Sequence, residues 1–168
     1  ILLYGPNRGK IDNIVQNIRN ILGYEVKTFH YSDISKNFRY IVNTQNLFTQ
    51  QEIIKIFITN VSLNKEVKNN ILEDSNNFLI FISEPPAQSL KLLFEQENSL
   101  AAIACYSEEG SSLRDIIKDK LSNRKVSQEA FLYLLQHLNG DRFYIESELN
   151  KILIYTENEG QVTLDDVK

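Results

Sequence analysis

Apolar residues in the first hundred positions follow two alternating spacings. Short runs rich in β-branched residues predict buried strands, whereas apolar residues three or four positions apart predict amphipathic helices. The apolar runs fall at residues 1–4, 25–31, 52–59, 78–83 and 100–106. Helical spacing falls at residues 11–22, 32–44, 62–72 and 90–94. Because strands and helices alternate, we expect an α/β fold with a five-stranded parallel sheet and helices on both of its faces.

The pattern changes after residue 106. Beyond this point we find no strand pattern, and three amphipathic helices are predicted instead, at about 111–122, 128–138 and 142–153. Ser127 and Asp141 stand where side-chain caps of the second and third of these helices are expected. We therefore predict two domains, an α/β domain at residues 1–106 and a small helical domain at residues 107–168.

The chain opens with a strand, a glycine-rich turn and a helix, which is the context of a phosphate-binding loop. A working loop places four residues between its two glycines and ends in Lys followed by Ser or Thr. Here only three residues separate Gly5 from Gly9, and Ile11 takes the place of the hydroxyl after Lys10. We expect a structural turn with a solvated Lys10, formed by Gly5, Pro6, Gly9 and Lys10.

The other parts of a catalytic site are also missing from the sequence. The strand at 52–59 ends in Thr59-Asn60, without the acidic residues that would organise magnesium. His30 and His137 have no partner at metal-ligand or triad spacing, and Cys105 is expected to be a small core residue. We therefore expect no catalysis, no metal and no cofactor. An ATP-hydrolysing protein with an altered loop is the alternative.

Composition narrows the function further. The chain has 168 residues, of which 42% are hydrophobic and 24% charged, and its net charge of −4 argues against strong binding to a nucleic-acid backbone. The basic residues at 118–125 alternate with acidic ones and are interpreted as a solvated face, with a DNA-facing role as the alternative. The sequence lacks a membrane-length apolar stretch and a signal peptide, and has a single cysteine, so we expect a cytoplasmic location. It also has no methionine and begins within a strand pattern, so we expect a fragment.

Leu47-Phe48 is an unusual pair, because two large apolar residues follow four polar ones where a loop is expected. The pair could lead into the next strand and pack beneath the preceding helix. It could instead be an exposed anchor for a partner, since burying each side chain in a pocket contributes about 1.5 to 3 kcal/mol. Spacing alone leaves both interpretations open.

Several segments together resemble one protein family. They are the opening LLYGPNRGKI, the Leu-Phe pair, EPPAQSLKLLFE at 84–95, LAAIACY at 100–106, GDR and ESELNKILIY within 140–155, and VTLDDV at 162–167. In order and spacing they resemble the delta subunit of bacterial DNA polymerase III over essentially the whole chain. The resemblance implies an AAA+-like α/β domain and a helical lid domain. It also implies a third, collar domain that this chain lacks.

The resemblance carries functional expectations. Delta subunits are non-catalytic clamp-loader subunits that bind the beta sliding clamp through a Leu-Phe wedge and open it for loading onto primed DNA. By position the wedge corresponds to Leu47 and Phe48, and the clamp-binding segment comprises Thr44, Gln45, Asn46, Leu47 and Phe48. Implied partners are the clamp and loader subunits of the gamma/tau and delta-prime type, with indirect or weak DNA contact and no membrane. A scaffold that contacts DNA or other subunits but not the clamp is a further alternative.

Overall fold

The computed structural model of the chain describes residues 1–44, 51–59, 65–72, 75–86, 88–157 and 160–168. By their contacts the residues divide into two compact units. The first unit comprises Ile1–Pro6 and Ile11–Cys105, and the second comprises Asn7–Lys10 and Tyr106–Lys168. Four residues of the opening turn therefore belong with the C-terminal part of the chain.

The first unit is built on a five-stranded parallel sheet with the strand order β2-β3-β4-β1-β5. The short strand β1 is central: Leu3 is in register with Ile82 on one side and Ile103 on the other. The strands are β1 (Leu2–Tyr4), β2 (Glu25–His30), β3 (Glu52–Phe57), β4 (Phe78–Ser83) and β5 (Ala102–Ala104). The predicted parallel sheet of five strands is confirmed.

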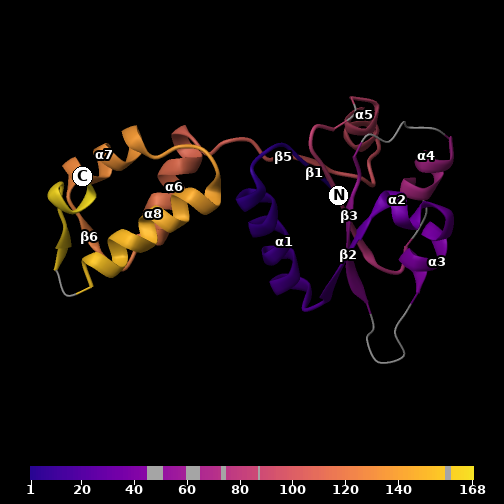
Figure 1. Cartoon of the computed structure of the whole chain (residues 1–168), viewed down its shortest axis with the longest axis horizontal. Helices are drawn as coiled ribbons and strands as arrows, with labels where there is room; N and C mark the ends of the chain where they lie inside the picture. Colours follow the sequence, from indigo (N-terminus) through magenta and orange to yellow (C-terminus); the bar gives the residue numbers. More distant parts are fainter. Residues whose placement is uncertain (45–50, 60–64, 73–74, 87, 158–159) are drawn as a thin grey trace. The chain divides into compact units, whose positions relative to one another are not determined.

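Helices cover both faces of this sheet. Helix α1 packs on one face through its part from Ile11 onward, and the other helices of the unit lie on the opposite face (Figure 1). The helices are α1 (Arg8–Leu22), α2 (Tyr31–Ile34), α3 (Phe38–Asn43), α4 (Lys65–Leu72) and α5 (Gln88–Gln96). The predicted arrangement of helices on both faces is thus confirmed.

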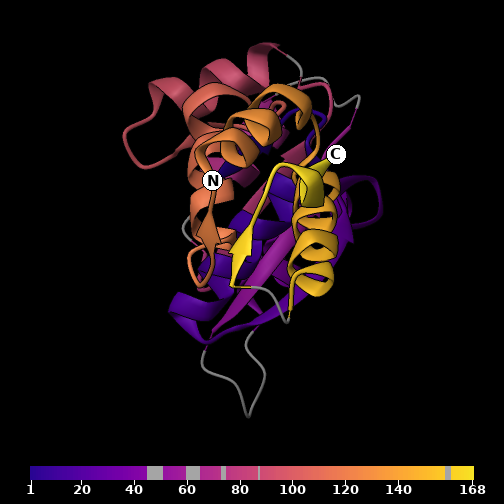
Figure 2. The same cartoon turned by 90° about the vertical axis from the view of Figure 1, so that its left-hand side faces the viewer.

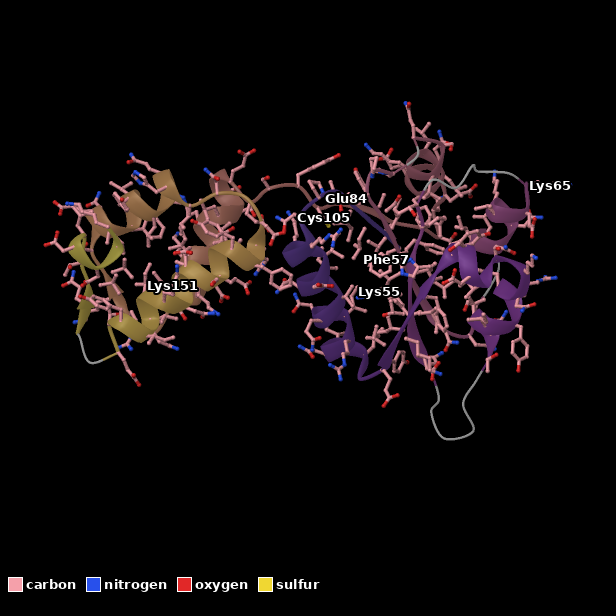
Figure 3. The ribbon with its side chains drawn as sticks, in the orientation of Figure 1. Lys55, Phe57, Lys65, Glu84, Cys105 and Lys151 are labelled. Atoms are coloured by element: carbon pink, nitrogen blue, oxygen red, sulfur yellow. The ribbon has the colours of Figure 1, made fainter. Side chains whose placement is uncertain are left out.

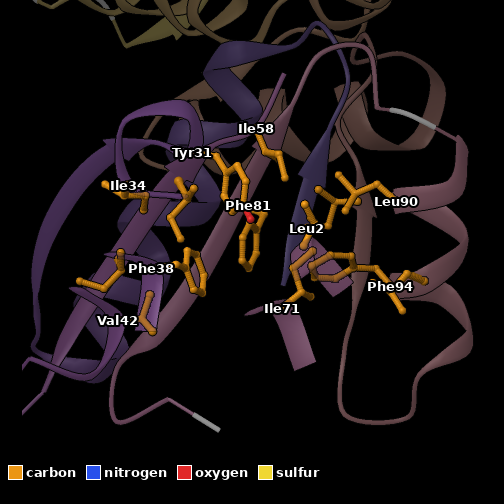
Figure 4. Close-up of a cluster of buried hydrophobic side chains, with 14 of the residues drawn as sticks. Leu2, Tyr31, Ile34, Phe38, Val42, Ile58, Ile71, Phe81, Leu90 and Phe94 are labelled. Atoms are coloured by element: carbon orange, nitrogen blue, oxygen red, sulfur yellow. The ribbon is translucent and has the colours of Figure 1, made fainter. Parts of the chain in front are cut away.

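Successive strand residues feed two separate cores because their side chains alternate between the faces. Leu2 belongs to the larger core under α2 to α5, whereas Leu3 belongs to the smaller core under α1. In the larger core the Phe81 ring lies 6.4 Å from that of Phe38 and 5.6 Å from that of Phe94, centroid to centroid. Figure 4 shows these three rings between the helices and the sheet. Such aromatic packing anchors the sheet against its helices.

Two details of the first unit differ from the sequence prediction. The single helix predicted at 32–44 is interrupted by a 3₁₀ turn, η1 (Ser35–Asn37), which separates α2 from α3. Ser and Asn are weak helix formers, and the turn buries none of its residues. Ile21 is one of the apolar residues that give 11–22 its helical spacing, but it is 81% exposed. At about 100° per residue it lies about 80° from Ile11, at the edge of the stripe.

The described residues of the second unit form three α-helices, as predicted. They pack around a core that includes Leu113, Ile117, Leu134, Ile145 and Leu149. The helices are α6 (Gly110–Lys120), α7 (Gln128–His137) and α8 (Arg142–Tyr155), followed by a 3₁₀ turn, η2 (Asp165–Val167). Both predicted caps are confirmed: Ser127 Oγ accepts a hydrogen bond from Ala130 N, and the Asp141 side chain accepts one from Phe143 N.

The expectation that no strand follows residue 106 was wrong. Strands β6 (Lys125–Val126) and β7 (Gln161–Val162) form a two-stranded parallel ladder, and Figure 2 shows them side by side. Each has only two residues, which is too short for a periodic pattern to reveal. Among the helices that the described residues form, none has the length and apolar character needed to cross a membrane.

Candidate functional site

The first glycine of the opening turn is fixed by its close approach to the end of β5. Gly5 has φ of +126°, a conformation that L side chains rarely adopt. A Cβ on this residue would lie 2.4 Å from the Cys105 carbonyl oxygen, and Tyr4 O accepts a hydrogen bond from Cys105 N at 2.6 Å. The next residue, Pro6, is exposed. Gly5 therefore allows the turn to pack directly against the backbone of Cys105.

Asn7 and Asp141 each cap two helices. The Asn7 Oδ1 atom accepts hydrogen bonds from Lys10 N in the first turn of α1 (2.9 Å) and from Arg142 N in the first turn of α8 (3.1 Å). The Asp141 carboxylate accepts from Phe143 N of α8 (2.7 Å) and from Gly9 N of α1 (3.1 Å). The start of α1 and the start of α8 thus share the Asn7 Oδ1 atom and use one oxygen each of the Asp141 carboxylate. All of these residues belong to the second unit.

Gly9 permits this approach because it has no side chain. A Cβ at this position would lie 2.4 Å from Phe143 N and 2.7 Å from Asp141 Oδ1. In a working loop a glycine lets the backbone approach a phosphate, whose oxygens accept from its amides. Here the space beside Gly9 holds the first turn of α8. Gly9, the second glycine of the turn, therefore allows close packing against α8, in the space where a working loop would hold a phosphate.

A buried carboxylate completes this cluster. The Glu108 side chain is 1% exposed and lies 3.5 Å from the Lys10 ammonium and 3.9 Å from the Arg142 guanidinium, and the Ser112 hydroxyl donates to its Oε2 atom. Its Oε1 atom has no hydrogen-bond partner among the described residues. On its exposed side, Arg142 Nε donates to Glu146 Oε1 at 2.7 Å.

These contacts determine what the turn can do chemically. The amides of Gly9 and Lys10 and the Lys10 ammonium all have oxygen partners within the chain. The expectation that Lys10 is a solvated residue was wrong, since its side chain is 27% exposed and paired with Glu108. That partner lies 98 positions away in the sequence. The geometry supports a structural role for Gly5, Gly9 and Lys10, whereas Pro6 is exposed.

The other predicted site follows α3. Thr44 is exposed and its hydroxyl donates to Tyr40 O, one turn earlier in the helix. The remaining residues of the predicted clamp-binding segment, Gln45, Asn46, Leu47 and Phe48, lie outside the described residues. The structure does describe the residues on either side of this segment, at 42–44 and 51–52.

One buried side chain holds both ends of this segment. Asn77 is 7% exposed; its amide nitrogen donates to Val42 O (2.9 Å) and Thr44 O (3.3 Å), and its Oδ1 atom accepts from Glu52 N (2.9 Å). Glu52 is itself buried and forms a 2.7 Å ion pair with Lys27 on the neighbouring strand. Asn77 therefore connects the end of α3 to the start of β3.

We expect Asn77→Ala to lower the free energy of unfolding by about 2 to 3 kcal/mol, because it leaves three backbone groups without their buried partner. The corresponding fall in Tm, followed by circular dichroism, is on the order of 10 °C. Asn76→Ala is the matched control: Asn76 is exposed, and its hydrogen bond to Asn43 Oδ1 is donated by its backbone N–H group, which the substitution keeps. Equal effects of the two substitutions would contradict the role assigned to Asn77.

The remaining polar candidates have ordinary structural surroundings. Cys105 is fully buried at the end of β5, which confirms the core prediction (Figure 3). His30 is exposed and stacks on Phe57, and the ring of His137 contacts Tyr133 O. Within the part of the chain that the structure describes, no group of three or more His, Cys, Asp or Glu residues could hold a metal ion.

The basic cluster interpreted from the sequence as a solvated face is partly exposed. Its members border the end of α6, and Arg124 donates to Glu157 O at 3.2 Å. Two of them, Lys118 and Lys125, are exposed. The cluster comprises Lys118, Lys120, Arg124 and Lys125.

Sequence reasoning missed several residues that organise these sites. The cap at Asp141 was recognisable, but nothing in the sequence indicated that it also serves α1. Glu108 stands in a polar stretch, Ser107-Glu108-Glu109, which gives no sign of burial. Asn77 lies among other Asn residues and carries no distinguishing pattern. All three act through partners that are distant in sequence.

Comparison with known proteins agrees with this architecture. The chain is 35% identical over 172 residues to the probable DNA polymerase III subunit delta of Rickettsia prowazekii (strain Madrid E), covering 99% of this chain and 54% of that protein. The solved structure of the Bacillus subtilis DNA clamp loader delta protein (YqeN) matches with a TM-score of 0.65 at 14% identity, covering 99% of this chain and 56% of that one. No protein-family model matches the sequence.

A five-stranded parallel α/β unit followed by a unit of three α-helices is the fold that this chain shares with the solved clamp loader delta protein. The sequence relationship is more specific than the likeness in fold, because the identity is 35% with the sequence relative and 14% with the solved structure. Over 99% of its length the chain is a sequence relative of a protein named as a DNA polymerase III subunit delta. It spans about half the length of the curated relative that it matches.

Proposed function

We propose that this chain carries the clamp-binding part of a non-catalytic clamp-loader subunit. In this proposal Leu47 and Phe48, preceded by Thr44, Gln45 and Asn46, insert into a hydrophobic pocket of the beta sliding clamp. The sequence relationship to a DNA polymerase III delta subunit over 99% of the chain is the observation that carries the proposal. Binding would favour the open ring and so shift the equilibrium of the clamp towards opening.

The two parts of the chain have different roles in this proposal. Residues 1–106 form the AAA+-like domain that presents the clamp-binding segment, and residues 107–168 form the helical lid domain. The lid domain would contact neighbouring loader subunits of the gamma/tau and delta-prime type. DNA contact would be indirect or weak, in keeping with the net charge of −4.

The surroundings of the clamp-binding segment support this assignment. Thr44 is exposed at the end of α3, and the backbone at both described ends of the segment is bonded to the buried Asn77 side chain. An anchor residue binds more tightly when the backbone on either side of it is already ordered in the free protein, because less conformational entropy is lost on binding. In the first unit, Thr44 and Glu52 are ordered in this way by their hydrogen bonds to Asn77.

The loop geometry supports a subunit that does not hydrolyse nucleotide. Its backbone amides and its lysine are bonded to oxygens of the chain itself. The work of clamp opening would then come from binding energy. ATP hydrolysis remains distinguishable by experiment, since magnesium-dependent ATP binding by the purified chain would contradict the proposal.

The proposal is tested by binding of the whole chain to purified beta sliding clamp, measured by biolayer interferometry without nucleotide. We expect saturable binding that does not change when magnesium and ATP are added. Absence of binding would contradict the proposal. Salt-sensitive binding to primed DNA without clamp binding would instead identify a DNA-contacting scaffold.

A further inference from the structure

The cluster formed by the shortened loop and the start of α8 has the donors of an anion site. Gly9 N lies in the first turn of α1, where backbone N–H groups and the helix dipole favour a negative ligand. Lys10 adds a positive charge from the same turn, and Arg142 adds a second from α8. A phosphate-binding loop uses the same kinds of donor, a backbone amide and a lysine.

In this cluster the protein's own carboxylates lie where an anionic ligand would contact these donors. Asp141 accepts from Gly9 N, and Glu108 lies against both Lys10 and Arg142. Glu108 is almost completely buried, so its charge is held inside the cluster and is not shared with solvent. Lys10 and Arg142 are paired with the carboxylates of Glu108 and Glu146. Asp141, which accepts from backbone N–H groups, adds a third carboxylate to the cluster's two cations.

We propose that the shortened phosphate loop is an occupied anion site whose ligands are the carboxylates of Asp141 and Glu108. The internal ligands satisfy the loop donors and repel a phosphate from the same place. Gly9 supports the assignment independently, because the space that its missing Cβ leaves is filled by Phe143 N and Asp141 Oδ1. This inference concerns the loop alone and does not rest on clamp binding.

The test asks whether an external anion replaces the internal ones. In Glu108→Gln/Asp141→Asn both carboxylates become neutral amides of nearly the same shape, so the cations are left in excess. We expect 10 mM inorganic pyrophosphate to raise the Tm of this variant by several degrees, on the order of 5 °C. The unsubstituted chain should gain no more than it does from potassium chloride at matched ionic strength.

Two controls separate site binding from a general charge effect. Glu129→Gln/Asp165→Asn removes the same net charge at exposed positions of the second unit and should not gain stability from pyrophosphate. Adding Lys10→Met to the Glu108→Gln/Asp141→Asn variant should abolish the gain. The proposal is overturned if pyrophosphate stabilises the unsubstituted chain equally, or if the variant with both carboxylates neutralised gains nothing.

A double-mutant comparison tests the same idea when the doubly substituted variant does not fold. Lys10→Met should lower the Tm of the unsubstituted chain by at least twice as much as it lowers the Tm of Glu108→Gln, because the lysine then has no carboxylate to neutralise. An equal loss in both backgrounds would overturn the proposal, since it would show that Lys10 and Glu108 do not interact.

Discussion

Replacing Leu47 and Phe48 together by Ala is expected to weaken binding to the beta sliding clamp by about 100-fold or more. Each side chain buried in a pocket contributes about 1.5 to 3 kcal/mol, and a loss of about 3 kcal/mol corresponds to a 100-fold change in Kd. The Tm of the variant should remain close to that of the unsubstituted chain. Both quantities are measured on the same preparations, by biolayer interferometry and circular dichroism.

Ile21→Ala/Tyr40→Ala is the matched control for this variant. Ile21 and Tyr40 are 81% and 75% exposed in the first unit, so their truncation removes comparable apolar surface without disturbing a core. Clamp affinity should be unchanged in this control. If the Leu47 and Phe48 substitutions lowered the Tm as strongly as a core truncation, the alternative interpretation that these residues pack beneath the preceding helix would be correct.

Gly5→Ala is expected to lower the stability of the first unit by about 3 kcal/mol or more. The added methyl group would lie 2.4 Å from the Cys105 carbonyl oxygen, and the φ of +126° is strained for any L side chain. Cys105 is backbone-bonded to β1 and fully buried, so it has little room to shift. The fall in Tm should exceed about 10 °C in thermal unfolding followed by circular dichroism.

Gly160→Ala serves as the control for Gly5. No atom lies within 4 Å of a Cβ built at Gly160, and its backbone is outside the left-handed region. The substitution should change the Tm by less than a few degrees. A Gly5→Ala variant with the same small effect would show that the turn is looser than its contacts imply, and would weaken the structural assignment of the loop.

The elements that the sequence predicted well are those whose signals are local. The strand at 78–83 agrees with β4 residue for residue, because it is a continuous apolar run bounded by polar residues. Ser127 and Asp141 were recognisable as caps, since a cap acts on the two or three residues that follow it. Periodicity within one element and capping at its end are visible without knowledge of the fold.

The features that the sequence did not predict depend on distant partners or on weak local preferences. Lys10 was expected in solvent because its carboxylate partner, Glu108, belongs to another part of the chain. The break between α2 and α3 falls at Ser35–Asn37, where helix preference is low but not prohibitive. The two-residue strands β6 and β7 exist only through their pairing with one another. Such features arise from tertiary contact.

The shared caps at Asn7 and Asp141 also have an evolutionary consequence. No single substitution would turn this loop into a working phosphate-binding loop. It would need one more residue between Gly5 and Gly9, a hydroxyl at position 11, and a side chain at position 141 that caps α8 without occupying Gly9 N. A variant with only the change at Asp141, or only the longer turn, would lose a helix cap and would not yet bind a nucleotide. Selection for stability alone would therefore oppose stepwise changes of this loop towards nucleotide binding.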